Sequence, residues 1–275
     1  MAPIHYLPSL KHVAICGGTH GNEMSGIFLV KHWLRNPTEL QRDTFHATPF
    51  LGNPRAVDKC VRYIDRDLNR TFSAEFLNSK DSDIESYEVQ RTWEVNQIFG
   101  PKGSFQAYDF MFDLHNTTSN MGACLIVDSE HSLLPMHMCN YIQKHYTKSS
   151  CPIFLYQLPG EETYGISSVA KAALGMLFPA FKIEAHKVAQ RIDYPRYSDG
   201  EISAVVHPNL QDKDFLPLKP GDPIFQTVNG EPILYEGNDI TYPAFINEAA
   251  YYEKKVAFVL MEKHTFSLPA LQKKF

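Results

Sequence analysis

The sequence lacks long apolar runs, paired cysteines and any excess of basic charge. Its longest apolar candidate, residues 172–181, is short and broken by Pro179, so we expect no membrane-spanning helix. Five cysteines, an odd number without paired spacing, favour a reduced cytoplasmic chain without a disulfide framework. A formal net charge of −5 leaves no basic surface for nucleic acid. The first residues have neither the charged nor the apolar region of a secretory signal, so we expect a soluble protein.

What the sequence does contain is enough apolar side chain for a packed core. The 275 residues are 44% hydrophobic and 12% aromatic, which suits one large or two modest domains. Up to about Pro179, apolar strand and helix patterns alternate, and this is typical of a mostly parallel sheet covered by helices. Beyond it, short apolar pieces alternate with turn signals. We expect an α/β domain over residues 1–176 and a smaller β-rich domain over residues 177–275.

The apolar patterns also predict individual elements. Two helices are expected, from about Met24 to Asn36 and over residues 133–146. The pair Asn229-Gly230 is the strongest hairpin signal in the chain. Strands are predicted at residues 13–16, 48–51, 108–114, 123–127 and 153–156.

Two histidines and a glutamate follow predicted strands. His20 and Glu23 come after the strand at residues 13–16, and His115 ends the strand at residues 108–114. In an open α/β sheet such positions gather at one edge. Two imidazoles and a carboxylate can hold a catalytic zinc ion that activates water and polarises a carbonyl. The alternative is that the glycine-rich run is only a strand-to-helix turn, with Glu23 at a helix N-terminus.

Residues 62–70 (RYIDRDLNR) are dense in charge and lack a helical period. One interpretation is a solvated turn held together by local pairs of aspartate and arginine. The other is an anion-binding cluster, because planar guanidinium groups bind carboxylates through two parallel hydrogen bonds and can stabilise an oxyanion. Beside a zinc site, the second interpretation predicts a substrate that carries a carboxylate.

Four runs resemble one family: residues 17–23 (GGTHGNE), 67–70 (DLNR), 113–118 (DLHNTT) and 247–254 (NEAAYYEK). Together they resemble the aspartoacylase and aminoacylase-3 family of zinc amidohydrolases, whose fold is similar to that of the zinc carboxypeptidases. The resemblance extends over nearly the whole chain. It implies a zinc-carboxypeptidase-like catalytic domain, a β-rich C-terminal domain, one Zn²⁺ per chain and self-association into a homo-oligomer.

The resemblance also implies roles for the matching residues at the centre of the site. His20, Glu23 and His115 match the zinc ligands, and Asp113 is a natural partner for a ligand histidine. Arg62 matches the arginine that polarises the scissile carbonyl and stabilises the tetrahedral intermediate.

Four further residues match positions that contact the substrate. Asn69 and Arg70 match residues that hold the carboxylate of the amino acid. Tyr251 matches a tyrosine supplied by the second domain, and Tyr164 is matched by a tyrosine of the substrate site.

Two departures from the family bear on function. Aspartoacylases carry an arginine shortly after the tyrosine that matches Tyr164, where it pairs with the aspartate side chain. Here residues 164–169 read YGISSV, without an arginine, which disfavours an aspartyl substrate. In this respect the chain is similar to aminoacylase-3, which prefers N-acyl aromatic amino acids and acetylated cysteine conjugates.

The second departure is a gap of a few dozen residues after Gly175-Met176. The family continues there into a strand that carries the general-base glutamate, whereas this chain passes directly into the second domain. Glu184 follows the join but lies in a second-domain context, so it is not a replacement.

The resemblance therefore predicts zinc-dependent hydrolysis of N-acyl amino acids to a carboxylate and a free amino acid, with the general base missing. Two alternatives stay open. The chain could be an aspartoacylase acting on N-acetylaspartate, or a catalytically silent zinc-binding protein that interacts with full-length subunits.

Overall fold

The structure is a computed structural model that describes residues 5–7, 10–78, 86–147, 150–156, 165–171, 181–269 and 271–273. The chain divides into two compact units. Unit 1 comprises Met1–Asn116, Glu161–Ala180 and Pro269–Phe275. Unit 2 comprises Thr117–Gly160 and Phe181–Leu268. Each unit has its own sheets and its own buried clusters of apolar side chains.

Unit 1 is built on a three-stranded parallel sheet in the order β3-β2-β4. The central strand β2 (His12–Gly17) is apolar and mostly buried, as expected for a parallel strand covered on both faces. β3 (His46–Leu51) and β4 (Phe110–Leu114) flank it. Pro49 fits in β3 because, among the described strands, β3 pairs with β2 alone, and the outer side of an edge strand needs no N–H donor.

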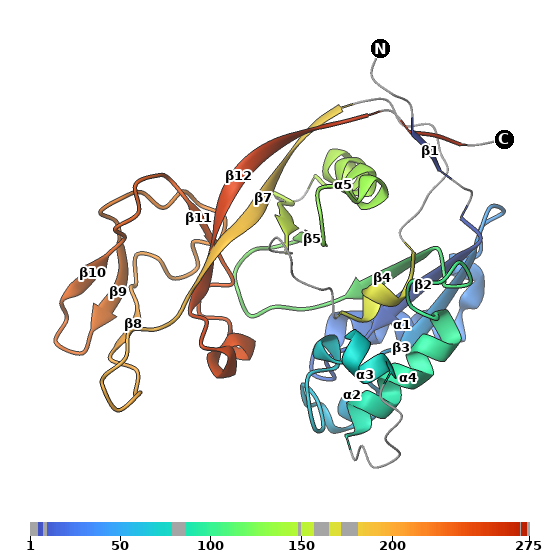
Figure 1. Ribbon diagram of the computed structural model, residues 1–275, viewed down its shortest axis with the longest axis horizontal. Helices are drawn as coiled ribbons and strands as arrows, with labels where there is room; N and C mark the ends of the chain where they lie inside the picture. Colours follow the sequence, from blue (N-terminus) through green and yellow to red (C-terminus); the bar gives the residue numbers. More distant parts are fainter. Residues whose placement is uncertain are drawn as a thin grey trace. The chain divides into compact units, whose positions relative to one another are not determined.

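The two faces of β2 carry different helices, as the alternation of side chains along a strand requires (Figure 1). Cys16 faces a core cluster that it shares with α4 (Tyr87–Phe99). Gly17 faces α1 (Met24–Arg35), and a Cβ added there would stand 2.3 Å from the carbonyl oxygen of Gly26. Glycine at position 17 is therefore what allows α1 to pack so closely against the end of the strand.

Short elements complete unit 1. The helical turns η2 and η3 add apolar side chains to the core cluster on the α4 side, and β1 pairs with β13 in parallel. These short elements are β1 (His5–Leu7), η1 (Pro37–Leu40), α2 (Pro54–Lys59), η2 (Leu68–Arg70), α3 (Ala74–Asn78), η3 (Ile166–Val169) and β13 (Leu271–Lys273).

Unit 2 contains a five-stranded sheet in the order β11-β12-β7-β6-β5. β5, β6 and β7 are parallel, whereas β7, β12 and β11 are antiparallel, and the long β7–β12 pair is plain in Figure 1. A separate antiparallel sheet has the order β10-β9-β8. The elements are β5 (Leu125–Val127), α5 (Leu133–His145), β6 (Ile153–Leu155), β7 (Phe181–Ile192), β8 (Ala204–Val206), β9 (Pro223–Thr227), β10 (Pro232–Leu234), β11 (Tyr242–Ala244), η4 (Ala249–Lys254) and β12 (Phe258–Leu268).

Most of the elements predicted from periodicity are present. The five predicted strands correspond to β2 to β6, and the two predicted helices to α1 and α5. The hairpin at Asn229-Gly230 is confirmed between β9 and β10, where Gly230 has φ of +84° and the Thr227 N–H donates to the Glu231 carbonyl at 2.9 Å. The mixed α/β fold with a β-rich C-terminal part is thus confirmed.

Three α-helices of the described chain, α2, α3 and α4, were not predicted. The buried face of α4 includes the polar residues Glu88 and Thr92, which interrupt the apolar period expected of a core-facing helix. α2 is only six residues long and begins at Pro54, where the sequence indicated nothing beyond the end of a strand.

In the described part of the chain, no helix combines the length and the apolar character needed to cross a membrane. All five cysteines are free of disulfide bonds.

Candidate metal centre

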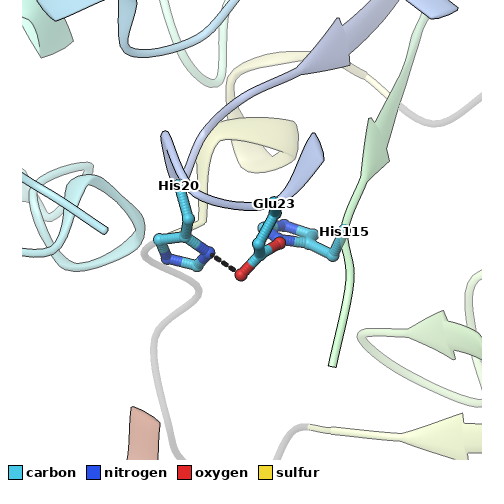
Figure 2. A group of neighbouring side chains, drawn as sticks. All are labelled: His20, Glu23 and His115. Atoms are coloured by element: carbon cyan, nitrogen blue, oxygen red, sulfur yellow. Dashed lines mark hydrogen bonds and ion pairs between the residues drawn. The ribbon is translucent and has the colours of Figure 1, made fainter. Parts of the chain in front are cut away.

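His20, Glu23 and His115 converge in unit 1 at the carboxyl ends of β2 and β4 (Figure 2). Their candidate ligand atoms all lie within 4.8 Å of one another. His20 Nδ1 is 2.6 Å from Glu23 Oε1, and His115 Nδ1 is 2.8 Å from Glu23 Oε2. Both imidazoles therefore turn the same nitrogen toward one carboxylate, and the convergence expected from the strand ends is present.

The outer nitrogen of each histidine faces a second carboxylate. His20 Nε2 is 3.0 Å from Asp67 Oδ1, and His115 Nε2 is 2.6 Å from Asp113 Oδ2. The contact predicted between Asp113 and a histidine of the cluster is present. Metal-bound histidines usually donate their second ring N–H to a carboxylate, which fixes the ring and makes it a better donor to the metal. The residues present thus fit a zinc ion in both donor type and support.

Charge is concentrated at this cluster. Although burial opposes it, the carboxylates of Asp113 and Glu23 raise the pKa of His115 to about 10. Burial favours neutral Glu23, but hydrogen bonds from His115 and His20 hold the pKa of that carboxyl well below its usual range. Glu23 is 8% exposed and also accepts from the Asn116 N–H at 2.9 Å. Opposite charges are thus concentrated at these side chains, and a cation bound between them would compete with the proton for the His115 ring.

The loop that carries His20 is held by backbone contacts that require glycine. Gly18 has φ of +72°, a left-handed conformation that favours glycine. A Cβ at Gly21 would stand 2.0 Å from the carbonyl carbon of Ala56 in α2. The loop then enters α1, with Glu23 at its N-cap, as one interpretation of the sequence expected. The loop that carries His20 and Glu23 is therefore also the start of α1. The two interpretations of residues 17–23, a strand-to-helix turn and a ligand loop, are compatible.

Arg62 joins the cluster from the charged run. Its Nη1 donates to Glu23 Oε1 at 3.2 Å, and its Nη2 donates to Asp67 Oδ2 at 3.5 Å. The local aspartate–arginine pair and the arginine beside the candidate ligands are therefore both present. The side chain of Arg62 is 25% exposed, so its guanidinium is partly accessible to solvent.

Asn69 and Arg70 lie on η2 at the same site. Asn69 Nδ2 is 3.3 Å from His115 Nε2, while Asn69 Oδ1 accepts from the Ile166 N–H of η3 at 3.0 Å. Arg70 Nη1 donates to the carbonyl oxygen of Asn69 at 2.7 Å. The structure therefore brings η2 and η3 to the His115 side of the cluster.

Other sequence predictions lie elsewhere. Tyr164 and the join after Gly175-Met176 lie outside the described residues. Tyr251 belongs to η4 of unit 2, so its substrate contact stays a prediction. Glu184 lies on β7 of unit 2 with a 60% exposed side chain that pairs with Lys263 at 2.8 Å, which agrees with its rejection as a general base.

Three residues of the site were given no role from the sequence. Asp67 is the carboxylate partner of His20, Thr19 donates to Asp113 Oδ1 at 2.7 Å, and Asn116 accepts from the Ser25 N–H at 2.9 Å. All three stand inside or beside the runs that carry the family resemblance. Their positions were visible in the sequence, but their partners depend on contacts between distant loops.

Comparison with known proteins identifies two family domains. The succinylglutamate desuccinylase/aspartoacylase catalytic domain matches residues 9–178, and the AstE/AspA barrel-sandwich hybrid domain matches residues 181–263.

Among individual relatives, the N-acyl-aromatic-L-amino acid amidohydrolase (carboxylate-forming) of Homo sapiens is 49% identical, covering 95% of this chain and 93% of the relative. The aspartoacylase of Danio rerio is 44% identical, covering 99% and 98%. The crystal structure of murine aminoacylase 3 superposes with a TM-score of 0.91 at 44% identity, covering 96% of this chain and 99% of that one. The chain therefore belongs to the succinylglutamate desuccinylase/aspartoacylase family.

Proposed function

We propose that this chain is a zinc-dependent amidohydrolase that cleaves N-acyl amino acids, with aromatic amino acids preferred, into a carboxylate and the free amino acid. The observation that carries the proposal is the cluster of His20, Glu23 and His115 with Arg62 at its edge. These three side chains would hold one Zn²⁺ per chain, and the ion would activate water and polarise the amide carbonyl. The high identity to N-acyl-aromatic-L-amino acid amidohydrolases supports this substrate class.

The chain's own residues would bind and orient the substrate. Arg62 offers guanidinium donors at the metal cluster, where they can stabilise the negative charge that develops on the carbonyl oxygen. Asn69 and Arg70 would hold the amino-acid carboxylate, and we extend this substrate-binding role to Tyr164 and Tyr251.

The sequence of η3 supports the preference for aromatic substrates. Ile166 and Val169 are buried in the core, and the Ser168 hydroxyl donates to the Gly165 carbonyl at 2.6 Å. This short segment contacts Asn69 and presents no cationic side chain. An aspartyl carboxylate would therefore lack a charged partner from η3.

A gap relative to the relatives bears on rate. The match to the human relative spans 298 aligned positions, but 95% of this 275-residue chain is about 261 residues. About 37 aligned positions thus have no residue here. We propose that the general-base glutamate falls in this gap. Since general acid–base catalysis contributes about 10²–10⁴ in rate, turnover should be slow by this factor.

The test is hydrolysis of N-acetyl-L-tyrosine by zinc-loaded, monodisperse protein beside murine aminoacylase 3, with His115→Ala as control. We expect zinc-dependent turnover about 10²–10⁴ below that of the murine enzyme and none in the control. A folded, zinc-bound chain that hydrolyses nothing would instead be a silent zinc-binding interaction protein. A rate equal to that of the murine enzyme would show that another group replaces the base.

Aspartoacylase activity is the second candidate, because the zebrafish aspartoacylase matches 99% of the chain. It can be tested with Ser167→Arg, since Ser167 is the half-buried residue of η3 whose side chain is neither in the core nor bonded to Gly165. The variant should gain activity on N-acetylaspartate in a length-restored chain. No gain would remove the argument from the missing arginine.

We also propose a catalytic domain over residues 1–176 and a C-terminal domain over residues 177–275, which the two matched ranges support. The compact units of the structure do not follow this boundary, because Thr117–Gly160 belongs to unit 2 with the C-terminal strands. Five unpaired cysteines support action in the reducing cytoplasm. A homo-oligomer is proposed by resemblance to relatives.

A further inference from the structure

Glu88 is a fully buried carboxylate whose acceptor sites are occupied. Its Oε1 accepts from the Ile64 N–H at 2.7 Å and from Asn53 Nδ2 at 2.9 Å. Its Oε2 accepts from the Asp65 N–H at 3.0 Å and from the Arg66 N–H at 3.2 Å. Glu88 is 0% exposed, so solvent water cannot replace these hydrogen-bond donors. Because all four partners are N–H donors, two at each oxygen, both oxygens of Glu88 must act as acceptors.

The contact between α4 and the Arg62 segment is reciprocal. Glu88 stands in the first turn of α4, where the helix dipole favours a negative charge. The Tyr87 N–H of the same turn donates to Asp65 Oδ2 at 2.6 Å. Each side of the contact thus satisfies backbone N–H groups of the other, although residues 64–66 belong to no helix or strand.

The three N–H groups held by Glu88 lie between two residues of the metal cluster. Arg62 precedes them and Asp67 follows them in the chain, and these two side chains contact Glu23 and His20. Asn53, whose side chain donates to Glu88, is also bonded to the loop that leads to His20: its backbone N–H donates to the Gly18 carbonyl oxygen at 2.9 Å. One buried carboxylate therefore connects the segment that carries Arg62 with the loop that leads to His20.

We infer that Glu88 is a positioning residue: it fixes the backbone of residues 64–66 so that Arg62 and Asp67 stand at the metal cluster. The part of this inference that concerns ligand binding by Arg62 rests on the proposed function; the part that concerns backbone order does not.

The first test needs no substitution. Hydrogen exchange of the zinc-loaded parent chain, followed by NMR, should show that the Ile64, Asp65 and Arg66 amides are protected despite their place in a loop. Exchange at the rate of an open loop, such as that of Gly103, would overturn the inference.

The second test is a double-mutant cycle with acetate, the simplest carboxylate that a guanidinium can bind. Glu88→Gln keeps the shape of the side chain but places an NH₂ group against two donors. We expect it to weaken acetate binding about tenfold, as Arg62→Gln should, and the double variant to bind no more weakly than either one. Glu94→Gln, on the same helix with a 59% exposed side chain, is the matched control and should change nothing.

Additive losses in the double variant would assign Glu88 a general structural role and contradict positioning through Arg62. If Glu88→Gln does not fold, the exchange rates of the parent chain decide the inference. Absence of acetate binding by the parent chain would count against the proposed function, and the exchange result would still decide the role of Glu88.

Discussion

At the scale of single residues, carboxylate side chains hold the two histidines of the cluster in place. Asp67 and Asp113 each face the outer nitrogen of a cluster histidine, and Glu23 lies between the inner nitrogens. The histidines are thus held with both ring nitrogens engaged. The orientation of the histidine rings therefore depends on Asp67 and Asp113 as much as on the candidate ligands themselves.

Replacement of Asp67 with asparagine should test this dependence. The amide has one acceptor oxygen and no charge, so it should orient His20 less firmly and leave Arg62 without one of its partners. We expect Asp67→Asn to weaken zinc binding about 10–100-fold in competition with a chelator. Asp58→Asn, at an exposed position of α2, is the control. Equal affinities would show that Asp67 does not support the ligand.

Asp214 predicts a pH dependence away from the cluster. Burial raises the pKa of Asp214 from its ordinary value of 3.8 to about 6. Because the folded-state pKa lies above the unfolded-state value, the stability that this group contributes is complete below pH 4 and is lost as the pH rises through 6. Asp214→Asn avoids the buried charge and can still accept from the Ile246 N–H.

The melting temperature of Asp214→Asn relative to that of the parent chain should therefore be higher at pH 7.5 than at pH 5. Asp239→Asn, at an exposed position, should show no such difference between the two pH values. A constant offset for Asp214→Asn at both pH values would exclude a titrating carboxyl as the cause.

The sequence predicted the residues of the cluster better than it predicted their partners. His20, Glu23 and His115 follow strand ends, and parallel strands bring such positions to one edge of a sheet. Asp67 and Glu88 could not be assigned in this way, because their hydrogen bonds depend on how a loop and a helix N-terminus fold against the sheet. Nothing in their spacing encodes that contact.

At the scale of elements, the close packing of α1 against β2 fixes the position of Glu23 at the N-terminus of α1. Gly17 lies on the strand and Gly26 on the helix, and neither carries a side chain to separate them. The predicted bounds of both elements agree with the structure to within about one residue, because β2 is a continuous apolar run and α1 has apolar side chains at helical spacing. α4 was not predicted, because its buried face includes Glu88, whose carboxylate accepts from the backbone N–H groups of residues 64–66.

Gly17→Ala should separate the two elements. Its Cβ would meet the Gly26 carbonyl at 2.3 Å, so helix or strand must shift. Overpacking of this kind costs about 1–3 kcal/mol in the free energy of unfolding, measured in urea. Leu34→Ala, at a 52% exposed position of α1, should change it by less than about 0.5 kcal/mol. A neutral Gly17→Ala would show that the contact is not close in solution.

At the scale of the whole molecule, the gap relative to the relatives is the dominant feature. Among the described strands, β4 pairs with β2 alone and β5 pairs with β6 alone. If a strand and its covering helix fall in the gap, as the resemblance implies, the loss of about five large buried side chains would cost roughly 1.5–3 kcal/mol each. An unpaired strand edge also favours association.

We therefore expect the chain to melt at least about 10 °C below murine aminoacylase 3 and to associate as its concentration rises. Calorimetry and light scattering at several concentrations would measure both. A melting temperature equal to that of the murine enzyme, with one mass at all concentrations, would show that the shortened chain has compensated for the gap.

The most direct measurement of the central claim is the zinc stoichiometry of the purified full chain. Metal-stripped protein should bind one tight equivalent of Zn²⁺, and His115→Ala should lose that equivalent while keeping its fold. Tight binding that persists in His115→Ala, or no tight binding by the folded parent chain, would contradict the assignment of His20, Glu23 and His115 as the metal centre.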